Sequence, residues 1–375
     1  MSNEYHWLYN GDEYYGALIS ALAQARISIR LEMYIFAAGG PGDAVRDALV
    51  AAAGRGVDVR VLIDAFGSVA LPSDYWSALL AAGGHYRSFN PLNLGRITFR
   101  DHRKLVVCDD RLALVGGFNI SGDQAGDGIA HGWRDLGLRI YGPLTSELGA
   151  SFDRMYDMAE FRHPRLMRMR RPRVRRSVPG IAAQAALLTS YPGAMSSPIK
   201  ESLVSDLRRA RTIRIISAYF LPTRRLNRVL CQNARRGGDV QIITAGKTDV
   251  RLARLAGRAM YGRFLRAGIR VFEYQPQILH AKLIVADNVV YVGSVNLDIR
   301  SLNINYELLV RIDDVHLASE AERLFQSYLP HCREIGQAEW ATSRSLWEKI
   351  TERIAFVILA RFDARLARRQ LKLLN

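Results

Sequence analysis

Two segments of this chain share one pattern, and this internal repeat constrains the fold more than any other feature of the sequence. The first segment, residues 101–119, reads DHRKLVVCDDRLALVGGFN, and the second, residues 279–296, reads LHAKLIVADNVVYVGSVN. The first copy has one extra residue between its aspartate and its first glycine. The aligned pairs are His102 with His280, Lys104 with Lys282, Asp109 with Asp287, Gly116 with Gly293, and Asn119 with Asn296. A repeat of this kind predicts two halves with the same local structure.

The similarity extends upstream of both segments and predicts the type of secondary structure. Residues 19–36 (ISALAQARISIRLEMYIF) resemble residues 204–222 (VSDLRRARTIRIISAYFLP), and residues 51–65 (AAAGRGVDVRVLIDA) resemble residues 232–246 (QNARRGGDVQIITAG). In each half the order is an amphipathic helix, a strand, a second helix that ends at glycine, and another strand. Apolar strands that alternate with helices predict an α/β fold, with a mixed and largely buried sheet flanked by helices in each half.

A basic segment separates the two halves. Residues 161–180, FRHPRLMRMRRPRVRRSVPG, contain eight arginines and three prolines. Such a segment is either a solvated linker or a basic arm that contacts the phosphates of lipid or nucleic acid. We predict a first domain over residues 1–160, this linker over 161–180, a second domain over 181–335, and a C-terminal segment over 336–375.

The C-terminal segment is predicted to form an amphipathic helix with a cationic face. Its apolar residues recur at helical spacing, with arginines between them. Such a helix either packs on the core of its own protein or lies in the interface of a membrane. The residues that set the spacing are Trp347, Ile350, Ile354, Val357, Ile358, Phe362 and Leu366.

The charge of the chain indicates anionic partners. The formal net charge is +16 at pH 7, and a surface this cationic concentrates nucleic acid or anionic lipid near it. Only six of the 52 cationic residues are lysines, so a lysine that recurs at a motif position is informative.

The sequence predicts neither a secreted nor a membrane-spanning protein. Its three cysteines stand far apart without a CxxC pair, so neither a disulfide framework nor a zinc site is expected. The start, MSNEYHWLYNGDEYY, is polar and acidic, unlike a signal peptide. The longest apolar runs have about seven residues, whereas roughly 20 are needed to cross a bilayer. We expect a soluble or peripheral protein.

The repeated HxK places a histidine and a lysine on the same face of a strand, because side chains alternate with period two. Lysine offers charge and donors to phosphoryl oxygens, and histidine attacks phosphorus or transfers a proton near neutral pH. The lysine disfavours a metal beside the histidine, and the sequence has no HExxH, no acidic ligand cluster and no GxxxxGK[ST] loop. We therefore expect phosphate chemistry without a metal or a cofactor, and a purely structural role is the weaker interpretation.

These features resemble the phospholipase D superfamily, whose members carry two HKD motifs, and within it the bacterial cardiolipin synthases. The resemblance covers residues 8–329. Besides the HKD copies it rests on LEMYIF (residues 31–36), WRDLGLRIYGP (residues 133–143) and GSVNLDIRSLNINYE (residues 293–307). It implies two similar α/β halves related by a pseudo-two-fold axis, with one shared active site.

The resemblance also implies a two-step exchange of a phosphodiester. One histidine attacks phosphorus and forms a phosphohistidine, while the other protonates the leaving alcohol. The second histidine then deprotonates the incoming alcohol. In the superfamily the first-motif histidine is usually the nucleophile, which assigns attack to His102 and general acid and base work to His280.

Further residues acquire roles through the resemblance. The residues expected to contact phosphoryl oxygens are Lys104, Lys282, Asn119, Asn296 and Ser294. Asp135 and Glu307 match the acids that orient the histidines, with Glu307 paired to His102 and Asp135 to His280. The motif aspartates Asp109 and Asp287 are included in the catalytic set, although such aspartates more often support the fold.

The function implied is phosphatidyl transfer, in which two phosphatidylglycerols give cardiolipin and glycerol. The expected partner is an anionic phospholipid membrane containing phosphatidylglycerol, and the sequence leaves open whether the second lipid donor is phosphatidylglycerol or phosphatidylethanolamine. No nucleic-acid partner is expected, and the oligomeric state stays open. The expected location is peripheral, on the cytoplasmic side of a bacterial inner membrane. The alternatives are a phospholipase D-type hydrolase, a superfamily nuclease, and a catalytically silent membrane-binding protein.

Overall fold

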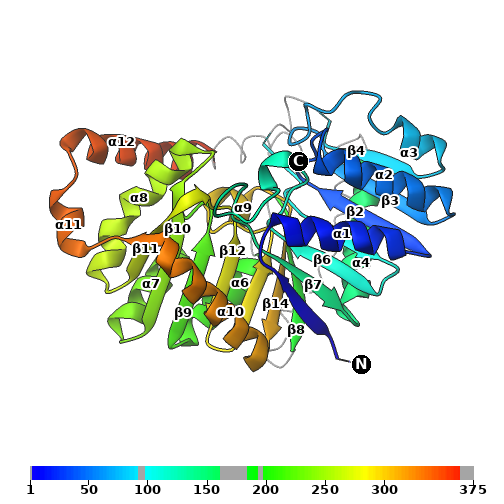
Figure 1. Cartoon of the computed structure of the whole chain (residues 1–375). Coiled ribbons are helices and arrows are strands. Elements are labelled where there is room, and N and C mark those ends of the chain that lie inside the picture. Colours follow the sequence, from blue (N-terminus) through cyan, green and yellow to red (C-terminus); the bar gives the residue numbers. More distant parts are fainter. Residues whose placement is uncertain (1, 92–97, 161–183, 193–196, 364–375) are drawn as a thin grey trace. The chain divides into compact units, whose positions relative to one another are not determined.

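The computed structural model of the chain (Figure 1) describes residues 2–91, 98–160, 184–192 and 197–363. They form two compact units, one from residues up to 160 and the other from residue 184 onward. The predicted linker and the part of the predicted C-terminal helix beyond residue 363 lie outside the described residues. The domain boundaries expected from the sequence therefore stay predictions.

The first unit is built on a seven-stranded mixed sheet with the strand order β1-β7-β6-β5-β2-β3-β4. Strands β2, β3 and β4 run parallel, and every other neighbouring pair is antiparallel. The strands are β1 (Glu4–Leu8), β2 (Ser28–Met33), β3 (Asp58–Asp64), β4 (His85–Phe89), β5 (Leu105–Cys108), β6 (Leu112–Gly116) and β7 (Gly137–Tyr141).

Helices cover both faces of this sheet. Alternate side chains of β2 and β3, such as Leu31 and Val61, are buried in one core with α1 and α2. Arg30 points to the other face, where its guanidinium pairs with Asp153 of α4 at 2.9 Å. The helices are α1 (Gly11–Gln24), α2 (Pro41–Gly54), α3 (Ser77–Ala81), the 3-10 turn η1 (Gly122–Gln124) and α4 (Leu144–Glu160).

The second unit is built on an eight-stranded mixed sheet with the order β15-β11-β10-β9-β12-β13-β14-β8. Again three neighbours, β9, β10 and β11, run parallel, and the other pairs are antiparallel. The strands are β8 (Ala185–Ser190), β9 (Thr212–Ser217), β10 (Asp239–Lys247), β11 (Arg270–Ile278), β12 (Lys282–Ala286), β13 (Val289–Gly293), β14 (Glu307–Asp313) and β15 (Cys332–Glu334).

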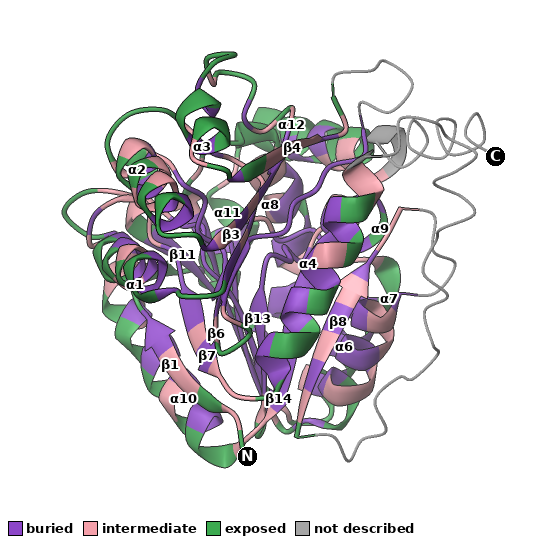
Figure 2. Ribbon diagram, turned by 90° about the vertical axis from the view of Figure 1, so that its right-hand side faces the viewer, coloured by how far each residue is buried: buried purple, intermediate pink, exposed green. Residues whose placement is uncertain are grey.

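The helices of the second unit bury a separate apolar core, which α6, α7 and α8 share with the sheet. Figure 2 shows the strands largely buried, whereas the helices expose one side. The helices are α6 (Pro198–Arg209), α7 (Arg224–Arg235), α8 (Arg251–Arg266), α9 (Ile299–Asn303), α10 (Val315–Tyr328), the 3-10 turn η2 (Leu329–His331), α11 (Gln337–Thr342), α12 (Leu346–Val357) and the π-helical turn η3 (Ile358–Asp363).

The two sheets share one strand order. The series β1-β7-β6-β5-β2-β3-β4 matches β8-β14-β13-β12-β9-β10-β11 strand for strand, with the same parallel and antiparallel pairs. The added strand, β15, lies at the edge of the second sheet. The prediction of two similar α/β halves with mixed sheets flanked by helices is confirmed.

Glycines end the second helix of each half, as the sequence predicts. Gly56 after α2 has φ 87°, and Gly237 after α7 has φ 88°. This left-handed conformation favours glycine, because a β-carbon would crowd the backbone there. After each of these glycines the backbone continues into a buried parallel strand, β3 or β10.

The motif aspartates form the hairpin turns after β5 and β12. Asp109 and Asp287 both have left-handed backbone, with φ 57° and 51°. The Asp109 carboxylate accepts hydrogen bonds from the amides of residues 26–28 at 2.7–2.9 Å. The Asp287 carboxylate accepts from the amides of residues 211 and 212, where the neighbouring strand begins. The extra residue of the first copy lies in this turn, where Asp110 is also left-handed at φ 50°.

We expect Asp287→Ala to lower the free energy of unfolding of the protein by about 1–2 kcal/mol, because it removes two hydrogen bonds and puts alanine in a left-handed turn. Asp287→Asn is the matched control. Its side-chain oxygen keeps both contacts of Asp287 Oδ1, and asparagine tolerates this backbone. Urea denaturation followed by circular dichroism measures both variants, and an equal loss for asparagine and alanine would contradict the assignment.

Candidate active site

The HxK residues lie at the start of an interior strand in each sheet. His102 and Lys104 precede β5, which pairs with β2 on one side and β6 on the other. His280 precedes β12 and Lys282 is its first residue, between β9 and β13. All four side chains are buried, with exposed fractions of 2–8%. Each pair thus occupies the same place in its own sheet.

In the first unit, Tyr34 forms an aromatic wall beside the HxK pair. The centroids of its ring and of the His102 imidazole are 4.9 Å apart. The Lys104 ammonium lies 5.1 Å from the same tyrosine centroid and donates to the His102 carbonyl oxygen at 2.7 Å. The lysine charge and the imidazole are therefore held next to each other. Tyr34 lies within LEMYIF, but nothing in that pattern predicts a role for it.

In the second unit, the lysine contacts the histidine directly. Lys282 Nζ is 3.1 Å from His280 Nδ1, and it also donates to the His280 carbonyl oxygen. The two HxK pairs therefore share a plan, because in each the lysine donates to the carbonyl oxygen of the histidine two residues before it.

Asp135 and Glu307 occupy equivalent positions. The Gly117 N–H donates to the Leu136 carbonyl at 3.0 Å, and the Ser294 N–H donates to the Leu308 carbonyl at 2.9 Å. Each acid is the residue before that leucine, and each is completely buried. The strand register therefore aligns the two acids that the sequence identified as orienting groups.

The first copy has Gly117 where the second has Ser294, and the two acids explain the difference. A β-carbon on Gly117 would lie 2.1 Å from Asp135 Oδ1, so the short acid fits only against glycine. In the second unit the Ser294 hydroxyl donates to Glu307 Oε2 at 2.5 Å. Asn305 donates to the other carboxylate oxygen at 3.3 Å, a contact that the sequence analysis missed.

The paired asparagines are buried at the end of the segment that follows each hairpin. Asn119 and Asn296 are both 2% exposed. Asn119 Oδ1 accepts from the Ile35 N–H at 3.2 Å, which leaves its Nδ2 group for another acceptor. Asn296 Oδ1 has no hydrogen-bond partner among the described residues. A buried amide with unused capacity is suited to a polar ligand.

Asp109 and Asp287, which the sequence analysis counted with the catalytic set, lie at the opposite end of their strands. Four residues of extended chain lie between Lys104 and Asp109, so their backbones are about 16 Å apart at the usual rise of a strand. The backbone amides of the neighbouring strand engage both carboxylates. Their contacts hold the strand that carries the HxK residues in place.

A buried charged cluster supports the first HxK pair from behind. Arg103 faces away from its two motif neighbours, and its guanidinium lies 3.1 Å from Glu32 and donates to Ser151 of α4 at 3.0 Å. Burial raises the pKa of Asp101 well above its usual range, and the charge of Glu32 raises this pKa further. The Asp101 N–H in turn donates to Asp64 at 2.9 Å, and burial raises the pKa of Asp64 to about 7.

The second unit has apolar residues at the same places. Strand register aligns the charged cluster of the first unit with small or aliphatic side chains of the second. The corresponding pairs are Glu32 with Ile216, Asp64 with Ala245, Asp101 with Leu279, and Arg103 with Ala281. The two histidine motifs therefore rest on chemically different supports, which the motif letters alone do not reveal.

We expect Arg103→Ala to destabilise the protein more strongly as pH rises from 5 to 8. Without Arg103 the pKa values of Glu32 and Asp101 rise further, so both keep their protons in the folded state while they ionise in the unfolded state. The loss of unfolding free energy grows by up to about 1.4 kcal/mol per pH unit for each such carboxyl.

The matched control gives the first unit the apolar set of the second. The triple variant Glu32→Ile, Asp101→Leu, Arg103→Ala has no carboxyl left in contact with the missing cation, and replacing a complete buried ion cluster is often neutral. Urea denaturation at several pH values should show the added pH dependence in Arg103→Ala only. The same pH dependence in both variants would contradict the role of Arg103.

The structure gives no indication of a metal centre in its described part. No group of three or more His, Cys, Asp or Glu side chains in residues 2–91, 98–160, 184–192 and 197–363 is placed to hold a metal ion. In the same residues no helix is long and apolar enough to cross a membrane. Each unit offers the same chemical groups, which are one imidazole, one ammonium group, one buried acid and one amide.

Known proteins resemble this chain in sequence and in fold. A family model described as "Cardiolipin synthase, PLD-like domain" matches residues 18–156 and 203–329. Cardiolipin synthase A of Erwinia tasmaniensis is 31% identical over 369 residues, which cover 94% of this chain and 74% of that protein. Cardiolipin synthase A of Salmonella arizonae is 30% identical over 368 residues, with the same coverage.

A solved structure matches the fold at low identity. Phosphatidylserine synthase of Haemophilus influenzae Rd KW20 aligns with a TM-score of 0.76 and 15% identity, over 96% of this chain and 93% of that chain. The family match and the relatives agree with the paired histidine motifs and the two matching sheets. This chain therefore belongs to the cardiolipin synthase family with phospholipase D-like domains.

Proposed function

We propose that this phosphatidyltransferase of the cardiolipin synthase type joins two phosphatidylglycerols to give cardiolipin and glycerol. The observation that supports it best is the pair of buried HxK motifs in equivalent positions of two matching sheets, within a chain of this family. The similar proteins are named for making cardiolipin or phosphatidylserine, which favours a lipid phosphodiester.

The proposed reaction uses both HxK pairs on one phosphodiester. His102 attacks the phosphorus of the first lipid, and its bond to phosphorus forms as the bond to glycerol breaks. His280 gives its proton to the departing glycerol and then takes a proton from the hydroxyl of the second lipid. That hydroxyl oxygen displaces the histidine, so the phosphohistidine is consumed and cardiolipin is released.

The remaining polar groups complete the proposed mechanism. The lysine ammonium groups and the asparagine amides stabilise the charge that builds on the phosphoryl oxygens in the five-coordinate transition state. Glu307 orients His102 and Asp135 orients His280 in the proposed cross-repeat arrangement. Tyr34 joins this set as a wall that limits the space around His102 and Lys104.

Two alternatives use the same histidine chemistry. A hydrolase would use water instead of the second lipid hydroxyl and release phosphatidic acid. A nuclease would bind a nucleic-acid backbone through the positive charge of the chain. The names of the similar proteins argue against the nuclease.

The location proposed for the enzyme is the cytoplasmic surface of a bacterial inner membrane.

Purified protein incubated with phosphatidylglycerol vesicles should produce cardiolipin and one equivalent of glycerol. Mass spectrometry measures both products. His102→Ala and His280→Ala should each lower the rate by at least about a hundredfold, because each removes one half of the exchange. The matched controls are His85→Ala and His316→Ala, which change exposed histidines of each unit and should leave the rate unchanged.

The products distinguish the alternatives. Phosphatidic acid without cardiolipin would identify a hydrolase, and cleavage of single-stranded DNA without lipid turnover would identify a nuclease. Acid-labile phosphate on the protein that is absent from His102→Ala but present in His280→Ala would support His102 as the nucleophile; the reverse pattern would exchange the two roles.

Gly117→Ser should lower the turnover rate far more than the reverse change, Ser294→Gly. The added β-carbon would lie 2.1 Å from Asp135 Oδ1, so the acid must move away from its position. Ser294→Gly removes one hydrogen bond to Glu307 but keeps that of Asn305, a loss of about tenfold in rate. Steady-state rates measure the difference, and unchanged activity in Gly117→Ser would disprove the proposed importance of Asp135.

A further inference from the structure

Helix α12 carries its large apolar side chains on the outside. A capping box fixes its start, because the Ser345 hydroxyl accepts from the Glu348 N–H and the Glu348 carboxylate accepts from the Ser345 N–H. A surface helix normally turns its apolar side toward the core. The exposed apolar residues are Leu346 (74% exposed), Trp347 (76%), Ile350 (39%), Ile354 (53%) and Val357 (38%), followed by Ile358 (40%) in η3.

The inner side of α12 is held by charge. Glu352 is only 2% exposed and pairs with Arg258 of α8 at 3.2 Å and with Arg344 at 2.8 Å. Both arginines lie over the ring of Trp340, at 4.8 and 3.9 Å from its centroid. These contacts fix the helix on α8, so its outer apolar residues are not needed for folding.

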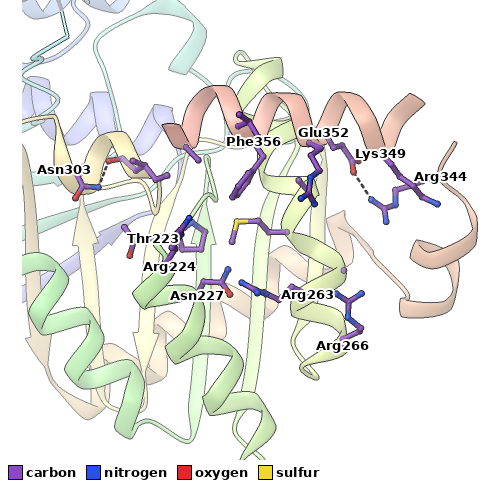
Figure 3. Close-up of a pocket in the computed structure, with 18 residues that line it drawn as sticks. Thr223, Arg224, Asn227, Arg263, Arg266, Asn303, Arg344, Lys349, Glu352 and Phe356 are labelled. Carbon is purple, nitrogen blue, oxygen red and sulfur yellow. Dashed lines mark hydrogen bonds and ion pairs between the residues drawn. The ribbon is translucent and has the colours of Figure 1, made fainter. Parts of the chain in front are cut away.

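A cationic groove runs along one side of α12. It has a volume of about 910 Å³ and lies between α12, α8, α9 and the start of α7 (Figure 3). Six cations line it. Arg344 pairs with Glu352, which Arg258 also engages, and the other five form no ion pair with a carboxylate of the described residues. These five cations, here called the groove cations, are Arg224, Arg263, Arg266, Lys349 and Arg353.

We propose that the outer face of α12 and the groove cations dock the enzyme on an anionic phospholipid bilayer. The apolar side chains enter the boundary between headgroups and acyl chains, and the groove cations bind lipid phosphates. An apolar helix face bordered by lysine and arginine is the composition of interfacial helices. Each cation near an anionic leaflet adds to the attraction.

Charge argues for a bilayer and against a second copy of the chain. A two-fold dimer through α12 would place the same patch on both sides of the interface, so the groove cations of one copy would face those of the other. A bilayer supplies the missing negative charge instead. The docking surface rests on the proposed function, because a transferase with lipid substrates must reach them at a membrane surface.

Vesicle flotation with the full chain tests the docking surface. We expect binding to vesicles of phosphatidylglycerol and phosphatidylcholine that weakens as salt rises, with little binding to phosphatidylcholine alone. Trp347→Ser with Ile354→Ser, and Arg263→Glu with Arg266→Glu, should each lower binding by about tenfold or more. The matched control, Ile27→Ser with Val69→Ser, removes apolar side chains that are 69% and 63% exposed in the first unit and should bind normally.

A second measurement reports directly on Trp347. Brominated acyl chains quench tryptophan fluorescence only at the depth of the bilayer. Trp7, Trp76 and Trp340 are buried in the protein, and the half-buried Trp133 is removed by using a Trp133→Phe background. Quenching by brominated phosphatidylglycerol vesicles should therefore disappear when Trp347→Phe is added to this background. Quenching that persists in this variant would overturn the proposal.

The test of the docking surface can fail or succeed independently of the proposed phosphatidyl transfer. His102→Ala should bind vesicles like the unmodified chain, whether or not lipids are turned over. Both docking variants should keep their activity in detergent micelles but lose it on vesicles. Unchanged vesicle binding in the two docking variants would overturn the docking surface. So would dimers in sedimentation equilibrium that dissociate in Trp347→Ser with Ile354→Ser while vesicle binding stays the same.

Discussion

The position of one interior strand in each sheet determines where the histidine and the lysine of each motif lie. β5 and β12 are each hydrogen-bonded on both sides, and an aspartate in the turn that follows grips the start of the neighbouring strand through its backbone amides. A slip of one residue would turn the histidine and lysine to the opposite face. The aspartate of an HKD motif thus fixes the register of its strand, and that register sets the face on which the histidine and lysine lie.

On this shared frame the two halves have developed different surroundings. The first motif lies beside Tyr34 and over a buried cluster around Arg103, whereas the second rests on aliphatic side chains. A two-step exchange asks one histidine to carry a covalent bond to phosphorus and the other to carry a proton. Chemically distinct supports are a physical means by which a duplicated motif takes on two roles.

The proposed chemistry and the proposed docking surface meet one requirement, which is access to lipids that stay in a bilayer. A cationic surface brings the enzyme to anionic lipid, and an apolar helix face gives it depth. The inner side of α12 shows how the fold permits this, because the Glu352 ion pairs and the packing of Ala355 and Phe356 secure the helix without its outer apolar side chains. Part of the positive charge of the chain is thus gathered in the groove cations, which form no ion pair with a carboxylate of the described residues.

The sequence by itself determined the repeat, the α/β class, the glycine helix ends and the residues of the two motifs, because each is written in local order and spacing. The strand register then aligned Asp135 with Glu307, as the sequence had suggested. Other features required the tertiary structure. The contact of Glu32 with Arg103 joins distant parts of the chain. The need for glycine at position 117 arises because a β-carbon there would collide with Asp135, which only the packing reveals. Periodicity predicted an apolar stripe on the C-terminal helix, but only packing against α8 decided that this stripe faces outward, because helical spacing does not tell which side meets the core.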